Sequence, residues 1–325
     1  MKHRLTILTA PIEPQQKFGL RAVRRYLGRL RNTFLFKGVT PDSYYGGHSA
    51  VTRSLVEGLL KIGVDFNYNP CKIDDIGDTC IVLSNVDALK QSIEWKKNNR
   101  IKYLLAGPNL VVRSSEFDCV LSSPEIDLCL VPSQWVNVAY IEDVLTLRGR
   151  TNIWYAGVDE TYWKPRVHKI KNNNALVYCK FNDVVFCEKI QNLLIDHGIN
   201  PIKLVYGKHS KDEYKSALEI SDFSIFISRS ESQGIALAES WAMDVPTLVW
   251  QSSEQLVINN RAYSSYSAGP YLNADLGDFW ETIEDLQFFL ENRKTYSPRK
   301  WLLNNMTDEL SAKLMLQICQ NVYKK

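Results

Sequence analysis

Short apolar runs alternate with longer amphipathic segments along most of this chain. The short runs are typical of buried strands, and segments such as 49–62 are typical of helices, since Val51, Leu55 and Leu59 share one side. The strand-like runs are 4–9, 64–68, 79–83, 101–106, 128–131, 152–155, 175–179, 202–206, 222–227 and 247–250. This alternation predicts an α/β protein with parallel sheets, which bind ligands at the carboxyl ends of their strands.

One polar run divides the strand-like segments into two sets. Residues 166–174 are mostly basic and amide side chains, which is typical of a linker. A chain of 325 residues is long enough for two domains. We therefore predict an N-terminal domain over residues 1–165 and a C-terminal domain over residues 166–297, with helical segments near 278–292 and 299–322.

Composition excludes several classes of protein. The chain has no run of 18 apolar residues, so we expect no membrane span. The apolar run near the N-terminus is too short for a signal peptide and reads as a first strand. The seven cysteines form no C-x-x-C pair, and no His/Cys cluster has zinc-site spacing. These features predict a cytoplasmic protein with no metal site.

The basic residues are unevenly distributed. Residues 14–41 hold seven basic residues and no acidic one, although the whole chain carries a net charge of only +3. Within this segment Val23, Leu27, Leu30 and Phe34 recur at helical spacing. A basic amphipathic helix over 17–37 would suit an anionic membrane surface, with a lipid-linked acceptor, or less readily a nucleic acid. A solvated helix packed on the first domain is the simpler alternative.

Two glutamates, Glu231 and Glu239, lie in one predicted strand–turn–helix unit. Gly234 lies where the helix should begin, and a helix N-terminus offers unpaired N–H groups and partial positive charge to a phosphate. Each carboxylate can accept hydrogen bonds from two adjacent hydroxyls. A nucleotide-sugar, with phosphates between two diols, would satisfy all three features. The alternative is one acid favoured by the helix dipole and one exposed helical glutamate.

The segment from Ile227 to Trp250 resembles the E-x7-E motif of retaining GT-B glycosyltransferases of family 4 and its relatives. The matching residues are Ser228, Glu231, Gly234, Glu239, Ala242 and Pro246. The chain departs from the pattern at Ser232, Gln233, Trp241 and Asp244. Asp244 replaces a glycine that ends the helix, so we expect it to adopt the left-handed conformation.

Three more segments resemble the same family in the family's order. Leu130–Val136 is similar to a V-P-S-x-W/F segment, and Ala156–Pro165 to the N-G-V-D signature at the crossing between domains. Tyr45–His48 is a weaker match to an early glycine-rich loop. The resemblance implies a GT-B fold, with an acceptor-binding N-terminal domain and a nucleotide-sugar-binding C-terminal domain. It also implies that the last helix, over 298–325, returns to the first domain after Pro298.

The resemblance assigns roles to individual residues. Glu231 would contact the donor sugar hydroxyls and Glu239 the ribose diol, and Lys180 would stabilise the leaving diphosphate. The family's second cation should lie near Val185, which is not basic, and Lys189, Lys208 or Arg229 could replace it. The predicted catalytic residues are Glu231, Lys180 and His48. The predicted donor-binding residues are Gly46, Gly47, Ser230, Ser232, Gln233, Gly234, Ile235, Glu239 and Gly207.

The function expected from this resemblance is transfer of a sugar from a UDP- or GDP-sugar to a glycan or lipid-linked acceptor, with retention, without a metal and without a cofactor. The sequence has no D-x-D motif. Ser84 and Asn85 stand where many relatives carry a histidine. Two alternatives remain open, a DNA glucosyltransferase and a non-catalytic protein that binds nucleotide-sugars.

Overall fold

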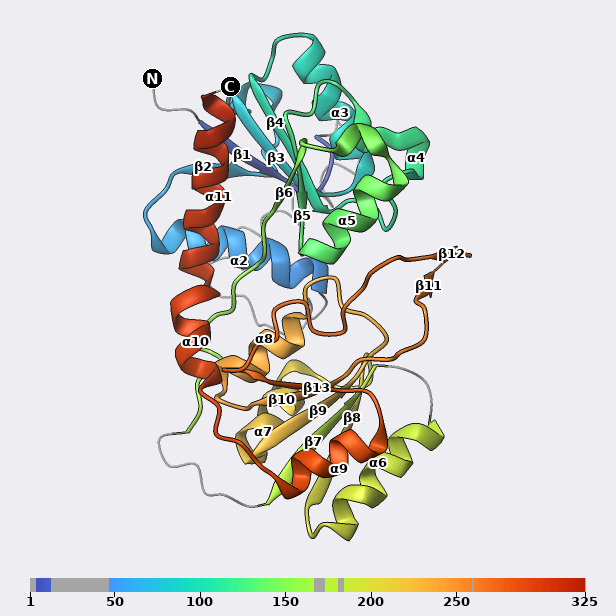
Figure 1. Cartoon of the computed structure of the whole chain (residues 1–325). Coiled ribbons are helices and arrows are strands. Elements are labelled where there is room, and N and C mark those ends of the chain that lie inside the picture. The colour runs from blue at the N-terminus through green and yellow to red at the C-terminus, as the bar shows by residue number, and fades with distance from the viewer. Residues whose placement is uncertain (1–3, 13–46, 167–172, 181–183, 259, 325) are drawn as a thin grey trace, which may run out of the picture.

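We analysed a computed structural model of the chain, which describes residues 4–12, 47–166, 173–180, 184–258 and 260–324 (Figure 1). The predicted basic helix over 17–37 and Gly46 lie outside these residues, as does the side chain of His48. Among the described residues, no helix is long and apolar enough to cross a bilayer.

The first domain is built on a six-stranded parallel sheet of order β2-β1-β3-β4-β5-β6 (Figure 1). The strands are β1 (Leu5–Leu8), β2 (Phe66–Tyr68), β3 (Thr79–Ser84), β4 (Tyr103–Asn109), β5 (Leu128–Val131) and β6 (Thr151–Ile153). The helices are α2 (Gly47–Lys61), α3 (Val86–Lys97), α4 (Glu116–Cys119) and α5 (Gln134–Asp143), with short 3₁₀ turns at Ile73–Asp75, Val120–Ser122 and Leu145–Leu147. The central strands β3 and β5 are buried along almost their whole length because helices cover both faces of the sheet.

The second domain is built on a five-stranded parallel sheet of order β13-β10-β9-β7-β8. Its strands are β7 (Asn174–Cys179), β8 (Asn200–Val205), β9 (Phe223–Ile227), β10 (Thr247–Trp250) and β13 (Gly277–Trp280). Helices α7 (Lys211–Ile220) and α8 (Ile235–Ala242) pack on one face, and α6 (Val184–Asp196) and α9 (Ile283–Glu291) on the other. The sequence pattern predicted a helix from residue 278, but 277–280 form an edge strand beside β10.

The chain returns to the first domain through two helices. Helix α10 (Pro298–Asn305) packs on α8, and α11 (Asp308–Tyr323) packs on α2 (Figure 1). The return predicted for residues 298–325 is therefore confirmed. The expectation of one helix over 299–322 is wrong, because Met306 ends α10 and the Thr307 side chain caps α11 by accepting from the N–H of Leu310.

The two chain passages between the domains lie side by side. Val158 and Thr307 form a parallel bridge, and Gly157 approaches Thr307 so closely that a Cβ there would lie 2.2 Å from the Thr307 carbonyl oxygen. The Gly157 N–H donates to Ser54 of α2 at 2.6 Å. A glycine is required at this position because backbone meets backbone.

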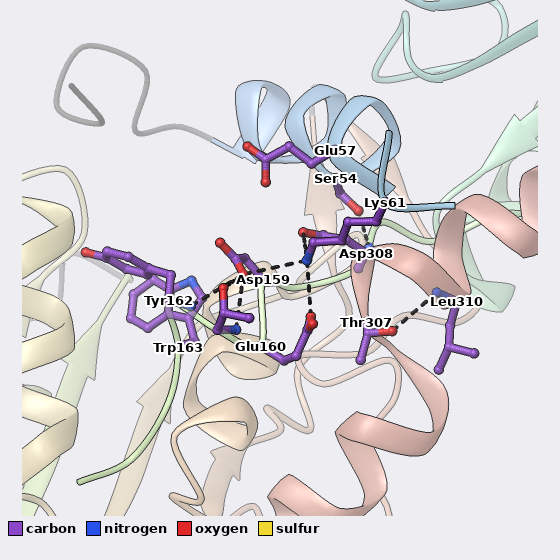
Figure 2. A network of polar contacts seen from close by, with 12 residues as sticks. Ser54, Glu57, Lys61, Asp159, Glu160, Tyr162, Trp163, Thr307, Asp308 and Leu310 are labelled. Carbon is purple, nitrogen blue, oxygen red and sulfur yellow. Dashed lines mark hydrogen bonds and ion pairs between the residues drawn. The ribbon is translucent and has the colours of Figure 1, made fainter. Parts of the chain in front are cut away.

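Charged side chains surround this crossing (Figure 2). Asp308 is fully buried and accepts from both terminal nitrogens of Arg53, at 2.7 and 3.3 Å. The Nζ of Lys61 lies 3.5–3.8 Å from carboxylate oxygens of Asp159, Glu160 and Asp308. These residues, which we call the crossing network, join α2, the outgoing segment and α11.

A hairpin of the second domain also contacts the first. After β10 the chain leaves its sheet and forms β11 (Val257–Ile258) and β12 (Arg261–Ala262), which reach α5 (Figure 1). Arg261 forms an ion pair with Asp143 at 2.7 Å, and Tyr263 packs against Ala139 and Trp135. We call residues 252–258 and 260–266 the inter-domain hairpin.

Candidate functional site

The turn between β9 and α8 lies at the carboxyl end of the second sheet. Gly234 caps α8 with φ 83° and ψ 56°, a left-handed conformation that favours glycine. A Cβ at this position would also lie 2.9 Å from Leu237 Cδ1. The first N–H groups of a helix have no partner within it, so the N-terminus of α8, capped by a residue without a side chain, suits an anion.

Glu231 is held in this turn by its backbone and by its carboxylate. Its N–H donates to the Ser267 carbonyl at 2.9 Å, and its carbonyl accepts from Trp135 Nε1 at 2.8 Å. Its carboxylate oxygens accept from Lys180 Nζ at 2.8 and 2.9 Å. The structure thus brings together two of the predicted catalytic residues, 51 positions apart in sequence.

Lys180 reaches Glu231 because it directly follows β7, the neighbour of β9 in the sheet. Its backbone N–H donates to the Ile227 carbonyl at 2.9 Å, which extends the ladder by one residue. Its Nζ also lies 4.8 Å from the centre of the Tyr206 ring. Tyr206 follows β8 and is half exposed, and Gly207 beside it adopts a positive φ of 76°.

Glu239 lies on α8 and is 5% exposed. Burial raises the pKa of the nearby Tyr178 hydroxyl, and the charges of Glu239 and Glu231 raise it further. Burial lowers the pKa of Lys211 at the start of α7, and the charge of Glu239 only partly offsets this. The Lys211 Nζ lies 3.7 Å from the centre of the Tyr162 ring. Glu239 thus shares its surroundings with a protonated phenol and a partly buried cation.

Gln233 links the turn to the first domain. Its side chain is 4% exposed, accepts from the Ala156 N–H at 2.9 Å and donates to the Ala156 carbonyl at 2.7 Å. We predicted a donor-binding role for this residue from its place in the motif. The structure gives its amide a different partner, because both ends of the amide are bonded to the backbone of Ala156.

The other predicted donor residues lie around the same turn. Ser230 and Ile235 are partly exposed, and Ser232 is exposed. Ser228 donates to the Ser230 carbonyl at 3.0 Å. Gly47 begins α2, whereas Gly46 and the side chain of His48 lie outside the described residues. Their donor-binding roles remain predictions.

Several residues were expected to replace family residues that this chain lacks, namely a histidine and a second cation. Asn85 has a positive φ of 76°, and its side chain caps α3 by accepting from the Ala88 N–H at 3.0 Å. Among the candidates for the second cation, Arg229 lies 3.7 Å from Glu254, and Lys189 is exposed on α6. Lys208 is also exposed, directly after Gly207. In the part of the chain that the structure describes, no group of three acidic, His or Cys residues could hold a metal ion.

Sequence reasoning missed several residues of this site. Trp135 was part of a matched motif, yet nothing in its spacing pointed to Glu231. Lys211 carries no sequence signal at all, because only the fold brings α7 near Glu239. Asp244, in contrast, has the positive φ of 56° that we expected at the end of α8.

Comparison with known proteins shows likeness in structure only. No protein-family model matches the chain, and no curated protein matches it significantly. The structure is similar to a glycosyltransferase from Rickettsia africae, with 13% identity, a TM-score of 0.56 and 100% of both chains covered.

Two further solved structures are similar. One is the catalytic domain of starch synthase IV from Arabidopsis thaliana, bound to ADP and acarbose, with 9% identity and a TM-score of 0.54 over 99% of this chain and 100% of that chain. The other is HepE from Anabaena, in complex with UDP and glucose, with 11% identity and a TM-score of 0.50 over 98% of this chain and 100% of that chain.

The class that fold and topology define is therefore the GT-B fold. Two parallel α/β sheets belong to two Rossmann-like domains, and the last helix crosses back onto the first. This confirms the fold predicted from sequence.

Proposed function

We propose that this chain is a retaining, metal-independent glycosyltransferase that moves a sugar from a nucleotide-sugar to a glycan or lipid-linked acceptor. The observation that supports it most is the group formed by Glu231, Lys180, Glu239 and the N-terminus of α8 at the carboxyl ends of neighbouring strands. Glu239 matches the ribose diol, Lys180 and the backbone N–H groups match the diphosphate, and Glu231 matches the sugar.

In this proposal the nucleotide lies along α8. The buried carboxylate of Glu239 accepts from the two ribose hydroxyls, and the first N–H groups of α8 donate to the diphosphate. Glu231 accepts from hydroxyls of the donor sugar. The acceptor approaches from the first domain, whose α5 contacts this turn through Trp135.

The chemical step breaks the bond between the anomeric carbon and the phosphate oxygen. Negative charge grows on the leaving diphosphate, and Lys180 with the α8 N–H groups stabilises it. The acceptor hydroxyl bonds to the anomeric carbon on the same face, and its proton passes to the leaving phosphate. The products are the glycosylated acceptor and a nucleoside diphosphate.

The paired state of Lys180 fits this role. Glu231 is partly buried, and its ion pair with Lys180 keeps both charges compensated within the turn. A bound diphosphate gives Lys180 a second anionic partner. Lys180 then lies between two anionic groups, the Glu231 carboxylate beside the donor sugar and the diphosphate beside α8.

The test begins with the donor. Nucleotides and nucleotide-sugars are screened by thermal shift, and the stabilising compound is assayed for slow hydrolysis and for transfer to acceptor extracts. A ligand at 100 times its Kd stabilises the folded state by about 2.7 kcal/mol, which this measurement detects. We expect Glu239→Ala to abolish the shift, because the ribose hydroxyls lose their acceptor. A Glu239→Ala protein that binds the donor normally would refute this assignment.

The same assays separate the alternatives. A protein that binds the donor but neither hydrolyses nor transfers it would be the non-catalytic relative that the missing basic residue near Val185 suggests. Strong salt-dependent binding to duplex DNA would favour a DNA acceptor. The seven basic residues within 14–41 support an acceptor at an anionic membrane surface in our proposal.

A further inference from the structure

The turn that carries Glu231 is attached to the first domain at two points. Trp135, in the first turn of α5, donates its indole N–H to the Glu231 carbonyl at 2.8 Å. Two residues further on, Gln233 exchanges two hydrogen bonds with the backbone of Ala156, which follows β6. Both partners belong to the first domain, although Glu231 belongs to the second.

The second domain contacts the same turn at Glu231. The Glu231 N–H donates to the carbonyl of Ser267, which directly follows the inter-domain hairpin, and the Glu231 carboxylate accepts from the Nζ of Lys180, at the end of a flexible side chain. The Trp135 ring is itself held at its other side, edge-on to Tyr263 of that hairpin at 6.1 Å between ring centres. Trp135 therefore lies between the turn and the hairpin that also packs on α5.

From these contacts we infer that Trp135 and Gln233 are positioning residues, which shape the donor-sugar half of the site only when the two domains are in contact. The expected effect on nucleotide-sugar binding and turnover rests on the proposed function, whereas the expected effect on the structure of the turn does not. Neither side chain needs to touch the substrate, since each acts through the backbone beside Glu231.

This arrangement separates the two halves of the donor. Glu239 and the start of α8, which would hold the nucleotide, belong to the second domain, whereas Trp135 and Gln233 join the turn before α8 to the first domain. Binding of a nucleotide alone then depends less on Trp135 and Gln233 than binding of the sugar does, because the sugar meets a Glu231 that these two residues have placed. Loss of positioning should lower affinity for the nucleotide-sugar and its turnover, but not affinity for the nucleotide.

The decisive variant is Trp135→Phe, which keeps an aromatic ring against Tyr263 and removes the indole N–H. Its matched control is Trp250→Phe, because the Trp250 N–H also donates to a glutamate carbonyl, that of Glu281 at 3.2 Å, within the second domain. Losing one such bond should weaken binding of the nucleotide-sugar roughly two- to tenfold and lower its turnover by a similar factor. Binding of the matching nucleoside diphosphate should be unchanged in both variants.

A second measurement does not depend on activity. Hydrogen–deuterium exchange of the amides of residues 230–234 is compared in the ligand-free wild-type protein, Trp135→Phe, Gln233→Met and Trp250→Phe. We expect the amides of this turn to exchange faster in Trp135→Phe and Gln233→Met than in the wild-type protein. In the control, Trp250→Phe, they should exchange at the wild-type rate. Gln233→Met leaves two backbone groups of Ala156 unpaired, which destabilises the protein. If the Gln233 variant folds poorly, Trp135→Phe alone provides the test.

The outcomes are distinguishable. If Trp135→Phe exchanges and binds like Trp250→Phe, or loses nucleotide affinity as much as nucleotide-sugar affinity, the positioning role is overturned. If the wild-type protein binds no nucleotide-sugar but the turn exchanges faster in Trp135→Phe, the positioning role stands and the proposed function fails.

Discussion

A single lysine carries the electrostatic part of the proposed chemistry. Lys180 is anchored at the end of β7, and its Nζ is directed at Glu231 across the adjacent strand. Where charge develops on a leaving diphosphate, one preorganised donor is worth a factor of about 10² to 10³ in turnover. The position of Lys180 is therefore expected to matter for rate more than for binding.

We predict that Lys180→Met lowers donor hydrolysis by roughly 100-fold, since the leaving group loses its cation. Steady-state kinetics with the donor found by the thermal screen would measure this. Lys97→Met is the control, because Lys97 is an exposed lysine on α3 of the first domain, paired with Glu94, and should be neutral. Wild-type turnover in the Lys180 variant would show that another cation holds the diphosphate.

At this scale the sequence predicted types of residue better than their partners. Gly234 and Asp244 were predictable because left-handed backbone favours a few residue types. Gln233 was not, because its partner is the backbone of Ala156, 77 positions away. Every residue except proline offers the same backbone N–H and C=O groups, so the sequence does not show which residue will bond to Gln233.

Among the elements, the inter-domain hairpin is the least expected. Its strands are two residues long, too short for a period-two pattern to show. It is attached by Arg261, which shares the carboxylate of Asp143 with Arg113 and also donates to the Ala139 carbonyl at 3.2 Å. The hairpin is therefore attached to α5 by the ion pair of Arg261 with Asp143 and by the ring contact of Tyr263 with Trp135.

This attachment should weaken in acid. Burial acts to raise the pKa of Asp143, but hydrogen bonds from Ser115 and Arg113 and the charge of Arg261 outweigh it, so the pKa lies below the usual value. A depressed carboxyl pKa contributes stability that is complete above the unfolded value of about 3.9 and is lost as pH falls below it toward the folded pKa.

Urea unfolding of the wild-type protein and Asp143→Asn at pH 6 and at about pH 3 would test this. We expect the wild type to be more stable at pH 6 and the difference between the two proteins to shrink at the lower pH. A difference that is constant with pH would mean that the Asp143 charge does not hold the hairpin.

The whole molecule depends on the crossing network. Breaking a buried pair leaves an uncompensated charge and costs about 3–5 kcal/mol, and the partial exposure of Arg53 and Lys61 reduces this to roughly 2–4 kcal/mol here. We therefore predict that Asp308→Asn lowers the free energy of unfolding by that amount, measured by urea titration. Asp308 itself is fully buried at the start of α11.

The adjacent residue provides the control. Glu309 pairs with Lys313 at 2.6 Å on the exposed side of α11, so Glu309→Gln should change stability by less than about 1 kcal/mol. Equal effects of the two substitutions would show that α11 is held by its apolar face alone. The sequence predicted the return of this helix, but not its break at Met306, because there the Met306 carbonyl and the Asp308 N–H bond to the backbone of Val158, far away in sequence.

The return of α11 has a consequence for synthesis. Domains generally fold as units while the chain emerges, the N-terminal one first. Here one face of the first domain's core, at Leu55 and Leu59 of α2, is covered by Met315 and Ile318 of α11, which are translated after the entire second domain. The domain that leaves the ribosome first is therefore completed last, and until then its α2 surface is exposed to chaperones and to other nascent chains.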